Sequence, residues 1–335
     1  MPDPLTIDIV ICTYNRAEAL DHVLGALASQ AIAKGVAWSV LVVDNACTDR
    51  TWEVVQSHQS RSRLPGLRGI VEPRQGLTHA RQRGVHETSG DWIAFVDDDN
   101  LLEPDWISAI ADAIRAHPEA GGIGGRVVLD WEQPPPAFLD GFGFCFAEQD
   151  RGAQTTVVDN LAGAGMVLRR TALVGCGWVE RPLLADRIGK KLVSGGDVEI
   201  AQRIRGCGYP LWFTPHAVLR HRIPASRTTR RYFLKVNAAL GASEALVGAL
   251  TWPGDHDSWR RESWSTARRK AAWAAEEVGR ALRRRGLTPA LGWTAQAVGF
   301  LNGLKTIALM DSEHRSAVFG AANGTRRPDD RAGAL

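Results

Sequence analysis

The first half of the chain alternates short apolar runs with segments of helical periodicity. Each apolar run has the length of one buried strand, and each helical segment is long enough to cross back over a sheet. Strands that alternate with helices indicate a mostly parallel sheet with helices on both faces, which is the α/β class. The predicted strands are Ile7–Thr13, Trp38–Val43, Leu67–Val71 and Trp92–Val96.

Local signals place the helices between these strands. Asn15, with Glu18 three residues later, has the pattern of a capping box and predicts a helix that runs to about Gln30. Thr48 is expected to cap a short second helix in a similar way. Further helices are expected at Thr78–Gly90 and Pro104–Pro118.

The second half of the chain is less regular until it becomes helical. Trp131–Ala153 is rich in Pro, Gly and Phe and is expected to be a loop, whereas Asp197–Arg205 has helical spacing. From Thr228 to about Met310 the pattern is helical, with breaks at Trp252–Gly254 and around Gly286. The strands expected here are Gly121–Leu129, Ala164–Arg169, Leu211–Phe213 and Val218–His221.

Charge divides the chain into two parts. Residues 1–225 carry 22 Lys and Arg against 27 Asp and Glu, whereas residues 226–335 carry 18 against 10. We therefore expect an α/β domain at residues 1–225 and a basic helical extension at residues 226–335. The end of that extension, residues 323–335, is polar and rich in Gly and is expected to be disordered.

The extension combines arginine runs with tryptophan. Ser226–Arg231 and Arg280–Arg285 are basic, and Trp residues lie between and after them. This combination suits an amphipathic helix on an anionic membrane surface, and the alternatives are a helical cap on the first domain or a dimer contact. A full membrane span at Ala290–Met310 is not expected, because polar residues interrupt it. No nucleic-acid reader motif is present, so we expect no nucleic-acid partner.

Cysteine usage and the N-terminus bear on the compartment. The five cysteines form no CxxC pair, which argues against a disulfide framework and against a zinc site. The N-terminus has no basic stretch followed by an apolar run, so no signal peptide is predicted. We expect a cytoplasmic protein, with peripheral membrane contact as an option through the extension.

Polar clusters follow three of the predicted strands. They are Thr13–Arg16, Asp44–Asn45 and Asp97–Asn100. In an open parallel sheet, ligands bind beyond the carboxyl ends of the strands, so these clusters are expected to converge there. Three adjacent carboxylates repel one another unless a cation neutralises them, and a hard divalent ion such as Mg²⁺ or Mn²⁺ would do so. The alternative is a solvated turn that ends a strand.

Several single residues fit either a functional or a structural role. Asp44 suits a ribose or base contact but also a helix cap, and Arg81 suits a phosphate contact but also the surface. Asp197, after two glycines, suits a general base or a helix N-cap. Glu199 is expected to face solvent or an arginine, and His221 is either structural or a ligand.

Five motifs in order resemble the family 2 glycosyltransferases, which have the GT-A fold. The resemblance covers roughly residues 7–225. It implies that Thr13, Tyr14 and Arg16 lie against the base and ribose of a nucleotide. It also implies that Asp44 contacts the base. Arg74 and Arg81 would lie near the nucleotide or its pyrophosphate. The five motifs are VICTYNR, VVDNACTDRT, RQGLTHARQRG, WIAFVDDDNLLEPDWI and GGDVEIAQRIRGCGYPLWFTPHAVLRH.

The same resemblance implies roles for the carboxylates. The triplet is similar to the DxD motif, with Asp97 near the ribose or sugar, Asp98 on the donor sugar and Asp99 on the metal. His221 would contact the metal or the pyrophosphate. Asp197 aligns with the usual catalytic base, so inverting transfer of a sugar to an acceptor hydroxyl is implied, with Mn²⁺ or Mg²⁺ as cofactor.

The sequence departs from the family pattern at one position. Family members commonly have a glutamate where this chain has Gly196, which bears on acceptor contacts. A UDP-sugar is the favoured donor, and the acceptor is a carbohydrate, a lipid-linked glycan or a small molecule. The alternatives are a non-catalytic nucleotide-sugar binding module and a sugar nucleotidyltransferase. The second usually needs a Gly-rich, Lys-containing loop where this chain has TYNRAEA.

Overall fold

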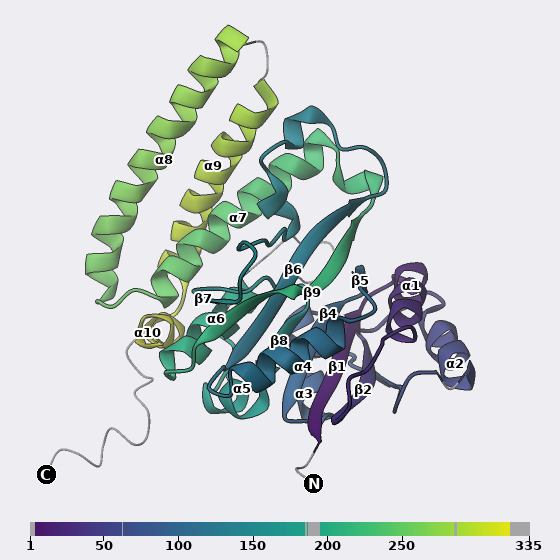
Figure 1. Ribbon diagram of the computed structural model, residues 1–335. Coiled ribbons are helices and arrows are strands. Elements are labelled where there is room, and N and C mark those ends of the chain that lie inside the picture. Colours follow the sequence, from purple (N-terminus) through teal and green to yellow (C-terminus); the bar gives the residue numbers. More distant parts are fainter. Residues whose placement is uncertain (1–3, 62, 185, 187–194, 285–286, 322–335) are drawn as a thin grey trace, which may run out of the picture.

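Nine strands of the described part of the chain form one sheet through the middle of the molecule (Figure 1). The computed structural model describes residues 4–61, 63–184, 186, 195–284 and 287–321. The order is β3-β2-β1-β4-β8-β6-β9-β5, and β7 pairs with β9. The strands are β1 (Leu5–Thr13), β2 (Val36–Asp44), β3 (Arg68–Val71), β4 (Trp92–Asp97), β5 (Asn100–Leu102), β6 (Gly122–Trp131), β7 (Thr156–Val158), β8 (Met166–Arg169) and β9 (Leu211–Ile223).

The sheet is parallel on one side and mixed on the other. Strands β3, β2, β1 and β4 run parallel, as the alternation of strands and helices predicts. Strand β8 is antiparallel to both β4 and β6, whereas β6 and β9 are parallel to each other. The carboxyl ends of β1, β2 and β4 therefore lie together at one edge, where the polar clusters follow them.

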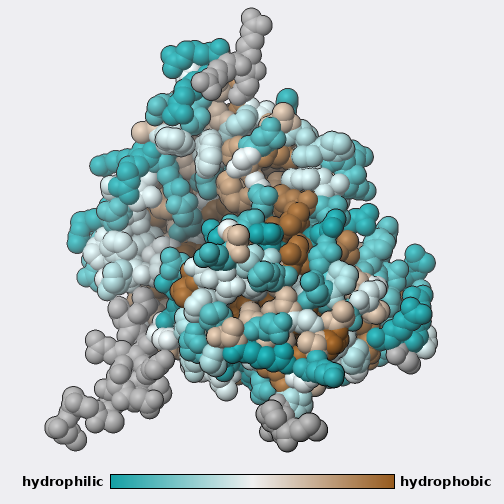
Figure 2. Space-filling view, in the orientation of Figure 1, coloured by the Kyte–Doolittle hydropathy of each residue, from teal (hydrophilic) through white to brown (hydrophobic). Residues whose placement is uncertain are grey.

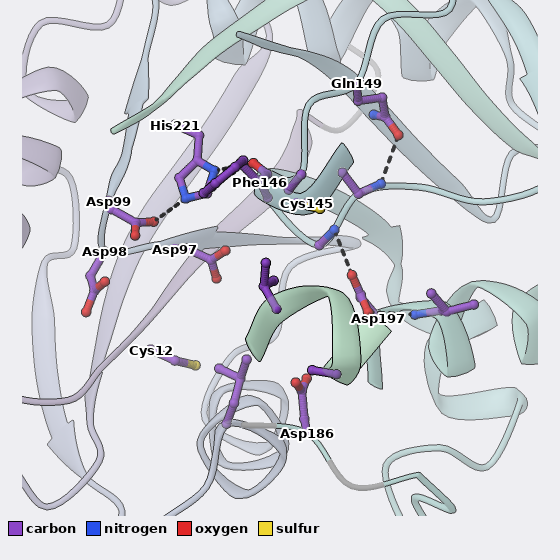
Figure 3. A pocket seen from close by; sticks show the side chains of 18 of the residues that line it. Cys12, Asp97, Asp98, Asp99, Cys145, Phe146, Gln149, Asp186, Asp197 and His221 are labelled. Carbon is purple, nitrogen blue, oxygen red and sulfur yellow. Dashed lines mark hydrogen bonds and ion pairs between the residues drawn. The ribbon is translucent and has the colours of Figure 1, made fainter. Parts of the chain in front are cut away.

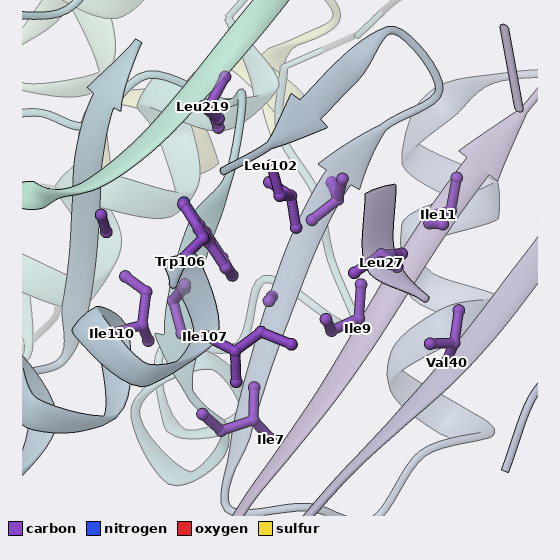
Figure 4. Packing of buried hydrophobic residues seen from close by; sticks show 14 of the residues in the cluster. Ile7, Ile9, Ile11, Leu27, Val40, Leu102, Trp106, Ile107, Ile110 and Leu219 are labelled. Carbon is purple, nitrogen blue, oxygen red and sulfur yellow. The ribbon is translucent and has the colours of Figure 1, made fainter. Parts of the chain in front are cut away.

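Helices cover both faces of the sheet. One apolar cluster packs α1, α2 and α4 against the side chains of Ile7, Ile9 and Ile11 (Figure 4). A second cluster packs α3, α5 and α6 on the opposite face, where Val10 points, because strand side chains alternate. These helices are α1 (Ala17–Leu27), α2 (Thr51–Arg61), α3 (Leu77–His86), α4 (Trp106–Ala116), α5 (Arg170–Gly175) and α6 (Gly196–Gly206).

Two local predictions are corrected. Asn15 does not cap α1: its φ is +53°, and its side chain accepts the Thr48 N–H at 2.6 Å. The carboxylate of Asp49 instead accepts the N–H of Ala17 at 3.0 Å and that of Thr51 at 3.1 Å, so one aspartate serves the first turns of both α1 and α2. The prediction that Thr48 caps α2 is also wrong, because Asp49 accepts the N–H of Thr51 at the start of that helix.

The two short strands predicted near the end of the domain are one strand, β9. It continues through Thr214–Ala217, a four-residue bulge of β9 that lies opposite Gly125 of β6, between the Gly124–Phe213 and Arg126–Val218 pairs. A Cβ at Gly125 would lie only 1.9 Å from the carbonyl oxygen of Ala217, so the close strand approach requires glycine there.

The predicted loop over Trp131–Ala153 contains two short 3-10 turns, η1 (Ala137–Leu139) and η2 (Gly143–Phe146). A third, η3 (Ala225–Arg227), joins β9 to the helical extension. Predictions for residues 323–335 and for the break around Gly286 lie outside the described residues.

The extension is helical, as predicted. Its helices are α7 (Arg230–Leu250), α8 (His256–Arg284), α9 (Leu287–Leu309) and α10 (Ser312–Gly320). Figure 1 shows α7 lying across one end of the sheet, with α8 and α9 beside it and farther from the sheet. In Figure 2, hydrophilic side chains predominate on the outer side of this extension, and hydrophobic ones gather nearer its junction with the sheet.

Helices α7 and α9 pack at backbone contact. A Cβ at Gly241 of α7 would lie 2.0 Å from the Gln296 carbonyl oxygen, and one at Gly299 of α9 would lie 2.0 Å from that of Ala238. Only glycine allows this approach, so α7 and α9 form one unit. By length and apolar composition α7 is the one described helix that could cross a membrane, but 50% of its most apolar window is buried inside the protein.

Candidate active site

A cavity of about 530 Å³ lies at the carboxyl ends of β1 and β4 and extends to the start of α7 (Figure 3). It is lined by both parts of the chain, because residues from β1 and β4 face residues from η2, α6 and α7. The structure brings nine of the eleven predicted site residues together around it. They are Thr13, Tyr14, Arg16, Arg81, Asp97, Asp98, Asp99, Asp197 and His221.

The aspartate triplet forms the turn between β4 and β5. Asp98 and Asp99 are buried, whereas the side chain of Asp97 is 37% exposed. Asp98 accepts a hydrogen bond from the Thr13 hydroxyl at 2.8 Å and from Arg16 at 3.0 Å. The triplet is therefore not a solvated turn: two of its three carboxylates are buried and are bound by Thr13, at the end of β1, and by Arg16, just after it.

Asp99 pairs with three basic side chains. Its Oδ2 accepts hydrogen bonds from Arg16 at 2.7 Å and from Arg227 at 3.2 Å, and its Oδ1 lies 3.4 Å from Nε2 of His221. Burial opposes ionisation, but the charges of His221, Arg16 and Arg227 outweigh it and hold the pKa of Asp99 below its usual range. For Asp98 burial prevails over the neighbouring Arg16 and raises the pKa to about 7.

The orientation of His221 suits a metal ligand. Its Nδ1 lies 2.6 Å from the carbonyl oxygen of Phe146, which is an acceptor and so places the proton on Nδ1. Nε2 then faces Oδ1 of Asp99 at 3.4 Å. A metal ion that took the place of a proton on Nε2 would be bound by both groups. Within the described residues no three His, Cys, Asp or Glu side chains converge as a complete metal cage.

Arg81 is not a surface residue. Its side chain is 4% exposed and lies 3.2 Å from Asp186 and 3.9 Å from Asp97. Its guanidinium also lies over the ring of Phe95, 5.3 Å from the centroid. The buried cation is thus shared between two carboxylates on the wall of the cavity.

Asp197 lies at the first turn of α6, across the cavity from the triplet (Figure 3). Its Oδ2 accepts the N–H of Gly163 at 3.1 Å, and its Oδ1 accepts that of Val198 at 2.9 Å. Gly195, with φ of +140°, makes the turn into the helix, a conformation that favours glycine. The backbone therefore fixes this carboxylate at the cavity wall.

Gly196 leaves room for another carboxylate. A Cβ at this position would lie 2.6 Å from Oδ2 of Asp186, which lines the same cavity. The carboxylate of Asp186 therefore lies beside the position where the resemblance implies a glutamate. Glu199, expected to face solvent or an arginine, is buried; it accepts the N–H groups of Leu183 and Leu184 and pairs with Arg203 at 3.0 Å.

Asp44 and Arg74 do not line the cavity. Asp44 accepts the N–H of Cys47 at 2.6 Å and so holds the turn after β2. Arg74 is 64% exposed and pairs with Glu72 at 2.8 Å. Their sequence neighbours Asn45 and Gln75 line the cavity instead.

Sequence reasoning missed a second group of cavity residues. Arg227 belongs to the basic run assigned to a membrane surface, and Asp186 lies in a segment without a motif. The apolar part of the wall carries no sequence signal because its residues are separated along the chain. It includes Phe144, Phe146, Val236 and Leu240.

Comparisons with known proteins identify the family of the chain. The model of glycosyl transferase family 2 matches residues 8–174. A glucosyl-dolichyl phosphate glucuronosyltransferase of Haloferax volcanii is 25% identical over 234 residues, which are 67% of this chain and 71% of the relative. The glycosyltransferase AglE of the same organism is 26% identical over 222 residues, which are 64% of this chain and 66% of the relative.

A solved structure extends the likeness to the fold. The mannosyltransferase from Pyrobaculum calidifontis, in complex with GDP-mannose and Mn²⁺, aligns with a TM-score of 0.56 and 19% identity over 88% of this chain and 86% of that chain. The shared architecture is the GT-A fold. Through residues 8–174, the chain belongs to glycosyl transferase family 2 and is a glycosyltransferase.

Proposed function

We propose that this enzyme moves a sugar from a nucleotide-sugar donor to an acceptor hydroxyl, with inversion at the anomeric carbon and with a divalent metal. The observation that carries the proposal is the pairing of two acidic groups across one cavity. Asp98 and Asp99 lie at the carboxyl end of β4, and Asp197 lies opposite at α6. A diphosphate leaving group beside Asp98 and Asp99 and an acceptor hydroxyl beside Asp197 would place the sugar between them.

The nucleotide would lie beyond β1. Tyr14 and Gln75 form one polar unit there, with the amide donating to the phenol oxygen at 3.1 Å. We propose that Thr13, Tyr14 and Arg16 lie along the base and ribose, with the guanidinium of Arg16 extending towards Asp98 and Asp99, and that Asp44 acts on the base through the turn that presents Asn45. Arg74 would approach only the outer part of a nucleotide, because it lies outside the cavity. A UDP-sugar stays our favoured donor.

Asp99 and His221 are the residues that would hold Mn²⁺ or Mg²⁺, since Asp99 is ionised and Nε2 of His221 faces it. The bound metal would supply stabilisation of negative charge on the leaving diphosphate. Asp97 and Asp98 would contact the ribose or donor sugar, because carboxylates accept hydrogen bonds from hydroxyls. Arg81, which is buried in the cavity wall, would orient the carboxylate of Asp97.

Asp197 would act as the general base. Its two oxygens accept backbone N–H groups, which orient the carboxylate and leave lone pairs to accept a proton. The acceptor hydroxyl would give its proton to Asp197 as its oxygen attacks the sugar C1. The bond from C1 to the diphosphate oxygen breaks on the opposite face, so the configuration inverts.

We propose a lipid-linked acceptor and an anionic membrane surface as the setting. Part of the cavity wall is apolar and includes Phe144, Phe146, Val236 and Leu240. The Haloferax relative is named for a dolichyl phosphate substrate. A carbohydrate or small-molecule acceptor would use the polar part of the cavity alone.

The proposal is tested by a thermal-shift panel with UDP, GDP, dTDP and CMP, each with and without Mn²⁺. A ligand that binds only the folded state raises its melting temperature, by an amount set by ligand concentration over Kd. We expect stabilisation by one nucleotide, and a larger one with metal. If a folded sample shows no shift with any of them at millimolar concentration, the protein is not a nucleotide-sugar enzyme.

A further inference from the structure

Arg227 reaches the cavity from outside the family-matched region. It ends η3, directly after β9, and belongs to the helical extension. Its side chain is only 16% exposed and its Nη1 lies 3.2 Å from Oδ2 of Asp99. Arginine is seldom this buried without a strong partner, so its position calls for an explanation.

Arg16 approaches the same oxygen from the other end of the chain. Its Nη1 lies 2.7 Å from Oδ2 of Asp99, and the same atom lies 3.0 Å from Asp98. Two guanidinium groups, from residues more than 200 positions apart, therefore converge on one carboxylate oxygen. They lie close to each other and to the open volume of the cavity, which both residues line.

This arrangement holds only while Asp99 carries the negative charge for both arginines. A divalent cation on Asp99 would repel the two guanidinium groups from the oxygen that they share. An anion that enters with the cation removes this conflict, because it can accept hydrogen bonds from both. The planar guanidinium, with five N–H donors, matches phosphate oxygens especially well.

We propose that Arg227, together with Arg16, binds the diphosphate of the donor, so that the helical extension completes the nucleotide site. This inference rests on the proposed function. In the empty enzyme both arginines neutralise Asp99. When metal and nucleotide bind, the two guanidinium groups move from Asp99 to the diphosphate oxygens. Metal and nucleotide therefore each favour the binding of the other.

A purely structural role predicts something different. In that case Arg227 only anchors η3 to the sheet, and its removal lowers stability without a selective effect on the diphosphate. The two roles are separated by comparing a nucleoside diphosphate with its monophosphate, since only the first has the β-phosphate. Melting temperature reports stability in the same samples.

The test is calorimetric titration of the full chain with UDP, UMP, GDP and GMP, each with and without Mn²⁺. The variants are Arg227→Met, which keeps the length of the side chain, and Arg227→Lys, which keeps the charge. Arg220→Met is the matched control, because Arg220 lies on β9, is 58% exposed and pairs with Glu103.

With Mn²⁺, Arg227→Met is expected to weaken the diphosphate on the order of tenfold to a hundredfold, the effect of one charge-assisted hydrogen bond. The monophosphate should change much less, and Arg227→Lys should recover part of the loss. Arg220→Met should bind like the wild type. Equal diphosphate affinity in wild type and Arg227→Met would overturn this inference alone. Failure of the wild type to bind UDP or GDP with Mn²⁺ would overturn the proposed function itself.

Discussion

The pKa values of two adjacent aspartates in one turn are shifted in opposite directions. The pKa of Asp98 is raised to about 7 because it is buried, whereas that of Asp99 is lowered because three basic groups surround it. The sequence Asp97-Asp98-Asp99 contains no sign of this difference. It arises from Arg16, His221 and Arg227, which the fold brings to Asp99 from distant positions.

The role of Asp197 gives the first prediction at this scale. Asp197→Asn should lower kcat at least a hundredfold, which is the usual contribution of a general base, because the amide cannot take a proton. Nucleotide affinity with Mn²⁺ should stay within about threefold, since Asp197 lies across the cavity from the triplet. Transfer assays and calorimetry on the same preparation measure both quantities.

The matched control is Asp159→Asn, because Asp159 is 88% exposed and pairs with Arg205. It should transfer sugar at the wild-type rate. If Asp197→Asn keeps near wild-type kcat, Asp197 is not the base, and Asp186 becomes the carboxylate to test.

At the scale of elements, the apolar pattern predicts the fold well. The four parallel strands are where their apolar runs predict them, and the helical extension has its predicted breaks at Trp252–Gly254. The cap of α1 could not be predicted, because its acceptor, Asp49, follows the next strand. The strand β9 was predicted as two strands, because its own bulge, Thr214–Ala217, interrupts the apolar pattern between them.

The positions of most candidate site residues could also be predicted from the sequence. Residues that end strands converge, because parallel strands end at one edge. Arg227 and Asp186 were missed, because their positions depend on contacts with Asp99 and Arg81 rather than on a local pattern.

The contact between α7 and α9 gives the prediction at this scale. Gly299→Ala should destabilise the protein by about 1–3 kcal/mol, because the new methyl group would lie 2.0 Å from the Ala238 carbonyl oxygen and force the helices apart. Gly279→Ala in α8 is the control, since a Cβ there meets nothing within 4 Å. It should be neutral or stabilise by up to about 1 kcal/mol.

Urea unfolding, followed by circular dichroism, measures both variants. An unchanged midpoint for Gly299→Ala would mean that α9 can shift without loss, and would contradict the close packing of the two helices.

At the scale of the whole molecule, the charge asymmetry has two components. Arg227 lines the cavity of the candidate active site, whereas the outer side of α8 presents Arg260, Arg261 and Arg268 beside Trp264, which is 53% exposed. Exposed leucines and a valine continue along α9. They are Leu287, Leu291, Val298, Leu301 and Leu309. Basic and apolar side chains on the outermost helices are what an anionic membrane surface binds.

We expect the protein to float with vesicles that contain phosphatidylglycerol and not with pure phosphatidylcholine. The double variant Arg261→Glu, Arg268→Glu should lose at least tenfold in binding, because each basic residue near the surface contributes about 1 kcal/mol. Arg280→Gln is the control, since Glu276 and Glu277 already pair with Arg280. Equal binding to neutral and anionic vesicles would contradict this assignment.

The close seam between α7 and α9 also has a geometric consequence. Because the backbones touch at Gly241 and Gly299, α9 and α7, the helix that lines the cavity, move as one body. On a membrane, the opening of the active site would then stand at a set height and angle above the lipid headgroups. The enzyme would then select acceptors by length. An acceptor whose hydroxyl lies at that height above the membrane would react, and a shorter or longer acceptor would not.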